Sequence, residues 1–237
     1  MKEQITALQT GPFGVNTYII PLADSYVLVV DPAACAFTRD ADKITGWLRS
    51  HGRTPAGIFI THGHFDHITG IAELRKAYPQ CPAAIHRDDA CALGPGAAAA
   101  QAQALETMGL SKFLPALASV PEADVTFTGG ETLDKVFGKT AGGRESPLQE
   151  DVLKALAQWR IIHTPGHSPG SVCLYSAERN ELISGDTMFY RSYGRTDLGG
   201  DENAIIRSLV MLKDTIPGET LVYPGHDYYG FTFSEGI

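Results

Sequence analysis

FITHGHFDHITG, residues 59–70, holds three histidines and one aspartate within six positions. Neither a solvated loop nor an apolar core accounts for such crowding, because imidazoles and carboxylates are seldom buried without partners. Both groups are good ligands for divalent metals such as zinc. The stretch follows an apolar run at 57–60, which predicts a buried strand, and it precedes a predicted helix over 68–78. It therefore predicts a metal-binding loop at the end of a strand.

The spacing of the four side chains favours two metal ions over one. His62 and His64 are two positions apart, so an extended backbone points both imidazoles the same way. Asp66 and His67 follow where the next helix begins. The chain between them is too short to wrap all four around one ion, whereas two ions about 3.5–4 Å apart could use them all. Each ion needs about four or five ligands, so other segments must contribute.

Three further segments place a ligand type in a glycine-bearing turn after an apolar strand. They are HTPGHSPGS with His167, LISGDTMF with Asp186, and LVYPGHDYYG with His226. Glycine permits a tight backbone, and proline restricts the loop so that a ligand loses less entropy on binding. Because loops at strand ends gather into sites, we expect these residues to meet the first stretch.

The motifs THGHFDH, TPGHSPGS, SGDT and YPGH resemble, in the same order, those of the metallo-β-lactamase superfamily. They span roughly residues 60–226, and VLVVDPA near the start resembles the opening strand motif of that family. The resemblance implies an α+β fold: a four-layer αββα sandwich of two packed mixed β-sheets with outer helices. It also implies one domain over residues 1–237, with the site on one edge of the sandwich.

The resemblance also implies a role for each candidate side chain. Asp186 would bridge two metal ions, and Asp31 would brace the site rather than bind metal. The expected ligands of the first metal are His62, His64 and His167, and those of the second are Asp66, His67 and His226. The implied cofactor is a pair of divalent ions, with zinc favoured and iron or manganese as alternatives.

The chemistry that such a pair supports is hydrolysis. Two adjacent cations lower the pKa of a bridging water from ~15.7 to about 7, and they stabilise the oxyanion that forms from a carbonyl. Asp66 would accept a hydrogen bond from that water as well as bind metal, so it is the candidate catalytic residue. The chain resembles the glyoxalase II-like thioesterases most, which implies a small-molecule thioester or related ester as substrate. Glyoxalase II carries a C-terminal helical extension that helps to bind glutathione. This chain stops eleven residues after His226, so glutathione recognition is not expected to follow that pattern.

Two other functions stay open at this point. DHITG and HDYYGFT resemble the persulfide dioxygenases, in which one iron would be held by His62, His167 and Asp186. GRTDLGGDEN, which begins at Gly194, favours the hydrolases. A metal-binding interaction module without activity would predict a damaged ligand set, and this set is complete.

Composition excludes several classes of partner and location. The net charge of −8 over 237 residues disfavours nucleic acid, which requires a basic face, and an anionic membrane surface. No apolar run approaches membrane-spanning length, and MKEQITALQT lacks the apolar core of a signal peptide. Scattered cysteines without a CxxC pair predict reduced thiols in a cytoplasmic protein; they are Cys35, Cys81, Cys91 and Cys173. The oligomeric state is not indicated.

Several segments outside the motifs carry expectations about local structure. Residues 15–20 and 26–30 predict a hairpin, and residues 125–133 predict a second hairpin region around Gly129-Gly130. Residues 87–120 are Ala-rich and would form either a surface helix pair or a cap over a pocket. Residues 135–158 look longer than the resembled family has there and would form either a lid or a surface decoration.

Other side chains near the motifs are expected to play supporting roles. His163 ends a predicted strand four residues before His167, and we expect it to be structural. Arg195 and Asp197 would form a buried ion pair that holds the loop after Asp186. His51, His86 and Cys173 are expected at the surface or satisfied in the core, with Cys173 a buried thiol. The tyrosines beside the motifs would be core or pocket wall: Tyr190, Tyr193, Tyr228 and Tyr229.

Overall fold

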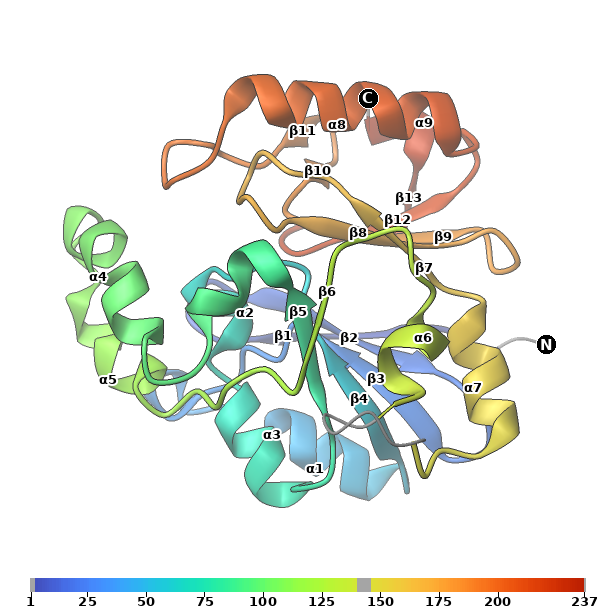
Figure 1. The fold of residues 1–237 in the computed structure, drawn as a ribbon, viewed down its shortest axis with the longest axis horizontal. Helices are drawn as coiled ribbons and strands as arrows, with labels where there is room; N and C mark the ends of the chain where they lie inside the picture. The colour runs from blue at the N-terminus through green and yellow to red at the C-terminus, as the bar shows by residue number, and fades with distance from the viewer. Residues whose placement is uncertain (1–2, 140–145, 237) are drawn as a thin grey trace.

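Two β-sheets pack face to face in the computed structural model, which describes residues 3–139 and 146–236 (Figure 1). The first sheet has the strand order β1 (Thr6–Thr10), β2 (Val15–Pro21), β3 (Tyr26–Val30), β4 (Thr54–Phe59), β5 (Ala83–His86) and β6 (Val125–Phe127). The second has the order β13 (Phe231–Thr232), β12 (Leu221–Pro224), β9 (Glu181–Gly185), β8 (Val172–Ser176) and β7 (Arg160–His163). A short ribbon joins β10 (Met188–Phe189) to β11 (Ser192–Tyr193).

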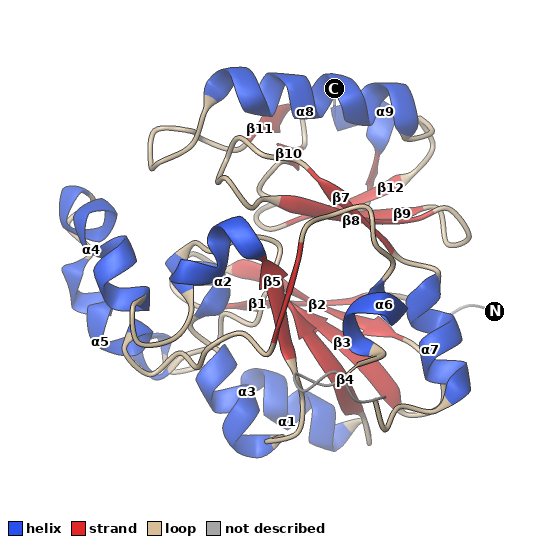
Figure 2. Ribbon diagram, in the orientation of Figure 1, coloured by secondary structure: helices blue, strands red, loops and turns tan. Residues whose placement is uncertain are grey.

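Helices cover the outer sides of both sheets (Figure 2). The α-helices are α1 (Lys43–Ser50), α2 (Phe65–Ile68), α3 (Ile71–Ala77), α4 (Ala97–Thr107), α5 (Leu114–Leu117), α6 (Leu133–Phe137), α7 (Glu150–Ala157), α8 (Glu202–Thr215) and α9 (Phe233–Gly236). Three short 3₁₀ helices are η1 (Ala36–Thr38), η2 (Arg87–Ala92) and η3 (Ser111–Phe113). The predicted αββα sandwich is confirmed. Across the described residues, no helix combines the length and the apolar character needed to cross a bilayer.

Alternation along the strands separates the layers. In β3, Leu28 packs into the core between the sheets, whereas Val27 and Val29 pack outward against α1 and α3. In β8, Leu174 points into the same inner core and Cys173 points outward to α8. Successive side chains of a strand face opposite sides, so a strand buried on both faces must be apolar throughout. That explains why YVLVV shows no polar alternation.

Parallel pairing brings the strand ends that matter to one edge. β3 runs parallel to β4, and β9 runs parallel to β12. Parallel neighbours end at the same side of a sheet. The residues that follow these strands therefore emerge together, and they belong to the segments that the sequence singled out.

The hairpin of β2 and β3 is confirmed, but two other local predictions are wrong. β6 pairs parallel to β5 rather than folding back, because the chain crosses to the second sheet at Gly129-Gly130, where Gly130 N–H donates to Ile161 O at 2.8 Å. The predicted helix 68–78 is split between α2 and α3 at Gly70. There the backbone N–H donates to Pro32 O at 2.8 Å, so it leaves the helical ladder.

The segment 135–158 packs into the core where it is described. Phe137 of α6 and Val152 and Leu156 of α7 join the inner cluster between the sheets. Residues 140–145 of the proposed lid lie outside the described residues. The described part of the segment contributes nothing to the pocket above the metal-binding loops and packs into the core, so it is neither the lid nor the surface decoration that the sequence suggested.

Replacing a leucine in the inner core tests which layer holds the sheets together. Leu174 is fully buried between the sheets, whereas Leu221 of β12 is 36% exposed. We expect Leu174→Ala to lower the free energy of unfolding by about 2–5 kcal/mol, because it leaves a cavity between two sheets. The matched control Leu221→Ala should cost less than about 1 kcal/mol. Urea denaturation measures both, and equal losses would contradict this account of the core.

Candidate metal centre

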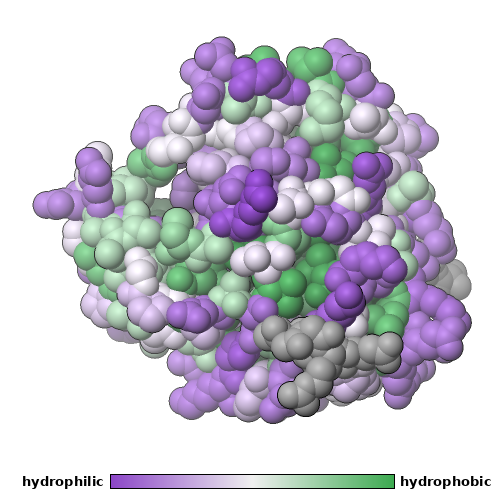
Figure 3. Space-filling model, viewed as in Figure 1, coloured by the Kyte–Doolittle hydropathy of each residue, from purple (hydrophilic) through white to green (hydrophobic). Residues whose placement is uncertain are grey.

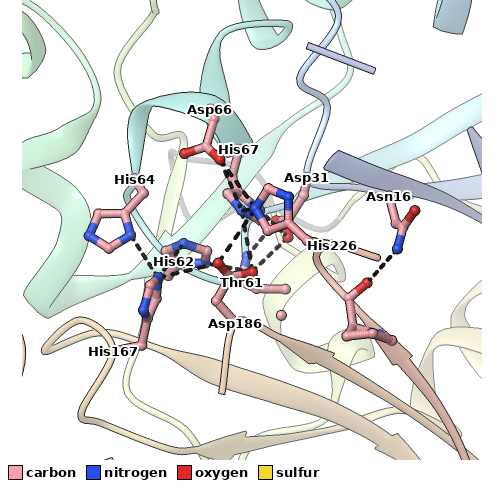
Figure 4. A network of polar contacts seen from close by, with 12 residues as sticks. Asn16, Asp31, Thr61, His62, His64, Asp66, His67, His167, Asp186 and His226 are labelled. Atoms are coloured by element: carbon pink, nitrogen blue, oxygen red, sulfur yellow. Dashed lines mark hydrogen bonds and ion pairs between the residues drawn. The ribbon is translucent and has the colours of Figure 1, made fainter. Parts of the chain in front are cut away.

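Seven side chains of the predicted set converge at one edge of the sandwich (Figure 4). Four come from the loop after β4 and the start of α2, and three from turns after β7, β9 and β12. In Figure 4 the side chains from the two sheets point toward one another. The sequence therefore identified the residues that meet, although they lie more than a hundred positions apart.

A first group of ligand types is made of imidazoles alone. His64 Nδ1 lies 2.7 Å from His167 Nε2, which lies 3.2 Å from His62 Nε2. Two ligands at 2.0–2.1 Å from one tetrahedral zinc ion would stand ~3.3 Å apart. The 3.2 Å separation agrees with that spacing and the 2.7 Å separation is shorter, so these three nitrogens are close enough to share one ion.

A second group mixes imidazole and carboxylate. His67 Nε2 lies 3.2 Å from His226 Nε2, and Asp66 Oδ2 lies 3.2 Å from the same nitrogen of His226. Asp66 Oδ2 is 3.7 Å from His67 Nε2. This group matches the N and O donors that borderline divalent ions accept.

The carboxylate of Asp186 lies between the two groups. Its Oδ2 is 3.5 Å from both His167 Nε2 and His226 Nε2, and its Oδ1 is 3.4 Å from His67 Nε2. Oδ1 is buried and has no hydrogen-bond partner among the described residues. A buried carboxylate oxygen without a partner is costly, and a bound cation would remove that cost.

Hydrogen bonds on the far side of the rings fix which nitrogen faces the centre. His67 Nδ1–H donates to Asp31 Oδ2 at 2.9 Å, and His167 Nδ1–H donates to Arg195 O at 2.7 Å. Thr61 Oγ1 donates to Asp31 and lies 3.0 Å from His62 Nδ1. Such partners are typical of metal-bound histidines, whose free nitrogen is then oriented toward the ion. The donor set fits a pair of divalent ions.

The contacts of Asp31 agree with the expectation that this residue braces the site. It adopts a left-handed backbone conformation with φ of 49° directly after β3, which is unusual outside glycine and asparagine-like residues. Its carboxylate accepts from Thr61 N–H at 2.8 Å and from the Thr61 hydroxyl at 2.6 Å. One side chain thus holds the start of the metal loop as well as the ring of His67.

The turn with His226 is held against the first sheet by Asn16 of β2. Its side-chain amide donates to Pro224 O and to Asp227 O, both at 3.1 Å. Gly225 lies so close to the centre that a Cβ there would stand 2.2 Å from Asp186 Oδ1. Only glycine permits that approach, which explains the glycine of the YPGH motif.

Burial and neighbouring charges separate the histidines electrostatically. Burial, followed by the nearby His167, lowers the pKa of His64 to about 4, and burial lowers that of His62 well below its usual value. Burial also opposes charge on His67, yet Asp186, Asp66 and Asp31 raise its pKa to about 10. His62 and His64 are thus neutral and ready to ligate at pH 7, whereas His67 must lose a proton.

Asp89 is a further residue of the site that the motifs did not reveal. It is 5% exposed, and its carboxylate accepts from Gly63 N–H at 2.8 Å, from the Ser168 hydroxyl at 2.6 Å and from Gly170 N–H at 2.7 Å. It therefore ties the loop of His62 and His64 to the loop of His167. The only signal in the sequence is an acidic residue after the short strand at 83–86, which is too weak by itself.

Among the supporting predictions, those for histidine and cysteine agree with the structure. His163 and His86 stack at 4.2 Å, and their Nε2 atoms lie 2.9 Å from the carbonyls of Pro169 and Thr128. His51 is exposed. Cys173 is fully buried, and burial raises the pKa of its thiol to about 11. None of these groups faces the metal centre.

Two supporting predictions are wrong about burial. Arg195 and Asp197 do pair, with two contacts of 2.6 Å, but their side chains are 56% and 66% exposed, because the loop carries them out over the pocket rim. The four tyrosines are also exposed and are absent from the pocket lining: Tyr190, Tyr193, Tyr228 and Tyr229.

A pocket of about 320 Å³ opens above the two groups. Its floor includes His64, Asp66, His167, Asp186 and His226, and one wall is α4. This volume is at the small end of ligand pockets, which span about 300–1,000 Å³. The Ala-rich segment is therefore a cap over the site rather than a remote surface pair.

Known proteins resemble the chain along most of its length. The family model described as the metallo-beta-lactamase superfamily matches residues 10–226. A probable metallo-hydrolase of Bacillus subtilis (strain 168), YqgX, is 30% identical over 92% of this chain and 88% of its own. A hydroxyacylglutathione hydrolase of Ectopseudomonas mendocina (strain ymp) is 31% identical over 86% of this chain and 62% of its own. The solved protein TTHA1623, in a di-iron-bound form, is 28% identical with a TM-score of 0.71, and the match covers 97% of this chain and 95% of that one.

Asp89→Asn tests the link between the two loops of the first group. The amide NH₂ of the new asparagine would face the N–H groups that the carboxylate now accepts from. Two donors cannot bond to each other, so the loops should separate. We expect affinity for zinc at the first group to fall about 10–100-fold, as for other residues that orient ligands. Titration in competition with a chromophoric chelator measures it. Asp88→Asn removes the same charge from the exposed neighbour and should leave affinity unchanged; equal behaviour of the two variants would refute the role of Asp89.

Metal binding to the metal-free protein should release protons. Because the pKa of His67 is about 10, its ring is protonated at pH 7 and must give up one proton before its Nε2 can ligate. The affinity of the second group should therefore rise roughly tenfold per pH unit between pH 6 and 9. Calorimetric titration with zinc in buffers of different ionisation enthalpy counts the protons. Heats that do not depend on the buffer would contradict the expectation.

Proposed function

This chain belongs to the metallo-beta-lactamase superfamily, and from that premise we propose that it hydrolyses a thioester or related ester of a small molecule with two divalent ions. At the coarser level it is a metallo-hydrolase of this superfamily. The observation that carries the proposal is the position of Asp186. Its Oδ2 lies 3.5 Å from a ring nitrogen of each ligand group, and its Oδ1 lies 3.4 Å from His67 Nε2, so this carboxylate could bridge two ions.

The proposed ligand roles follow the two groups. His62, His64 and His167 would hold one ion, Asp66, His67 and His226 the other, and Asp186 both. When bound, such a pair supplies a hydroxide at neutral pH and stabilises a developing oxyanion. Zinc is favoured by the N and O donors, and iron or manganese would also be accepted.

Asp66 is the proposed catalytic residue because it faces both the ligand group and the pocket. Burial opposes its charge, but His67 and His226 hold its pKa well below the usual range. It is therefore a carboxylate at all working pH values, able to accept a hydrogen bond from the attacking water and to orient it. Asp31 and Asp89 would keep the loops in place while the substrate exchanges.

A thioester is favoured by the hydroxyacylglutathione hydrolases among the relatives and by the GRTDLGG loop, whose Arg195 reaches the pocket. The matched region covers 62% of the hydrolase from Ectopseudomonas mendocina. Reactivity toward thioesters is the part of that relative's chemistry proposed for this chain.

Persulfide oxidation is the second candidate, because DHITG and HDYYGFT match that branch of the superfamily. The three side chains needed for one iron are adjacent: His167 Nε2 lies 3.2 Å from His62 Nε2 and 3.5 Å from Asp186 Oδ2. Three protein ligands leave positions open for oxygen and substrate. The second group would then have no metal to hold, which makes this candidate the weaker one. An inactive metal-binding module would not require the complete set of seven candidate ligands.

Metal content and thioesterase activity test the proposal together. We expect about two zinc ions per chain, and a loss of about 10²–10⁴-fold in kcat/KM for Asp66→Ala, as for other general acid–base residues. Elemental analysis and a thiol-trapping assay measure the two quantities. Asp214→Ala, an exposed carboxylate on α8, is the control. One iron per chain, with oxygen uptake on a persulfide and no thioesterase activity, would select the second candidate.

A further inference from the structure

The pocket above the metal centre has an apolar wall that the proposed reaction does not require. Its hydrophobic residues come from four places: the loop after β1, the start of α2, α4, and the region that follows Asp186. They include Phe13, Phe65, Leu105, Met108, Phe189 and Leu198. In the space-filling view, hydrophobic surface gathers over the region of α4 and α5 (Figure 3).

The part of the wall on α4 is a single helical stripe. Gln101, Ala104, Leu105 and Met108 line the pocket at the spacing i, i+3, i+4 and i+7, which places them on one face. Gln101 donates to Gly63 O at 3.0 Å, and Gly63 lies between His62 and His64. The stripe is therefore held in register with the first ligand group.

Aromatic side chains complete the rim. Phe13 meets Phe65 edge-to-face with ring centroids 5.6 Å apart, and Phe65 meets Phe113 at 5.4 Å. Phe13 remains 51% exposed, although burial of such a ring would be favourable. An apolar group entering the pocket would cover it.

Away from the metal ions that the ligands would hold, the charges around the pocket leave nothing to pair with an anionic acyl chain. Outside the proposed ligands, the charged residues that line it are Arg195 and Asp227, as far as the described residues show. Arg195 is engaged by Asp197 through two contacts of 2.6 Å, and Asp227 repels anions. A carboxylate that loses water here without a partner would be disfavoured.

From these observations we propose that the pocket selects thioesters whose acyl chain is uncharged and apolar, with the stripe on α4 as the specificity-determining surface. Ala104 would set the length of the chain, because the smallest side chain of the stripe lies between Gln101 and Met108. The inference rests on the proposed hydrolysis, and it adds the chemical class of the acyl group.

An acyl series on one neutral thiol, N-acetylcysteamine, tests the selection. With the metal-loaded protein, kcat/KM should rise about threefold to fourfold per methylene from acetyl to hexanoyl, the gain expected from burying a methylene. Succinyl should fall at least about tenfold below butyryl, because its carboxylate finds no partner. A flat series, or succinyl preferred, would overturn the proposal.

Two variants on α4 locate the selecting surface. Ala104→Phe should lower the hexanoyl-to-acetyl ratio of kcat/KM at least about tenfold by filling the pocket. Gln103→Phe adds the same ring one position away, on an exposed site outside the pocket lining, and should leave the ratio unchanged. Met108→Lys, at a half-buried position, should raise the succinyl-to-butyryl ratio. If both ratios of kcat/KM are the same in the unmodified protein and in the three variants, α4 does not select the acyl chain.

Binding of the free carboxylates separates this inference from the proposed reaction. Titration of the metal-loaded protein with acetate, butyrate, hexanoate and succinate needs no turnover. Tighter binding of hexanoate, reversed in Ala104→Phe, together with absent thioesterase activity would retain the pocket and reject the reaction. If the protein hydrolyses thioesters but binds all four carboxylates with equal affinity, the proposed reaction stands and the proposed selection by the pocket is wrong.

Discussion

The carboxylate of Asp186 lies between two groups of buried ligand atoms, and the rest of the site is organised around it. Its Oδ1 has no hydrogen-bond partner among residues 3–139 and 146–236, and ring nitrogens within each of the two groups face one another at 2.7–3.2 Å. Such an arrangement is unfavourable unless positive charge compensates it, since desolvated polar groups need partners. The burial of apolar side chains between and outside the sheets stabilises the fold and offsets the free-energy cost of holding these polar groups together.

Residues outside the proposed ligand set hold this arrangement, each at a point where two chain segments meet. Asp31 joins the end of β3 to the loop after β4, Asn16 joins β2 to the turn of His226, and Asp89 joins the loops of the first group. All three bond to backbone groups of the loops, and Asp31 and Asp89 also accept from side chains. Metal-site geometry of this kind depends on oriented ligands, so the supporting residues matter for affinity as much as for folding.

The metal centre and the pocket wall differ in what they have to satisfy. The centre must present fixed nitrogen and oxygen donors to ions, which restricts residue types and spacing. The wall must only match the shape and polarity of a substrate, and it is supplied by α4 and by loops that vary without disturbing the ligands. This separation would let one frame of ligands serve different substrates, and it makes the wall the place to test the proposed selection of substrate.

The sequence indicated most strand positions and the seven side chains that meet at the centre, because metal ligation demands a few residue types in turns after apolar strands, and its resemblance to the metallo-β-lactamase superfamily implied the sandwich and the ligand roles. Only the tertiary structure decided what depends on contacts between distant segments. These are the parallel pairing of β6 after Gly129-Gly130, the clamp by Asp89, the exposure of Arg195 and Asp197, and the place of α4 over the site. Metal ligands can be recognised from residue type and spacing along the chain. A hydrogen bond to a distant loop, or the burial of one helix face, leaves no such pattern in the sequence, because it depends on how the layers pack.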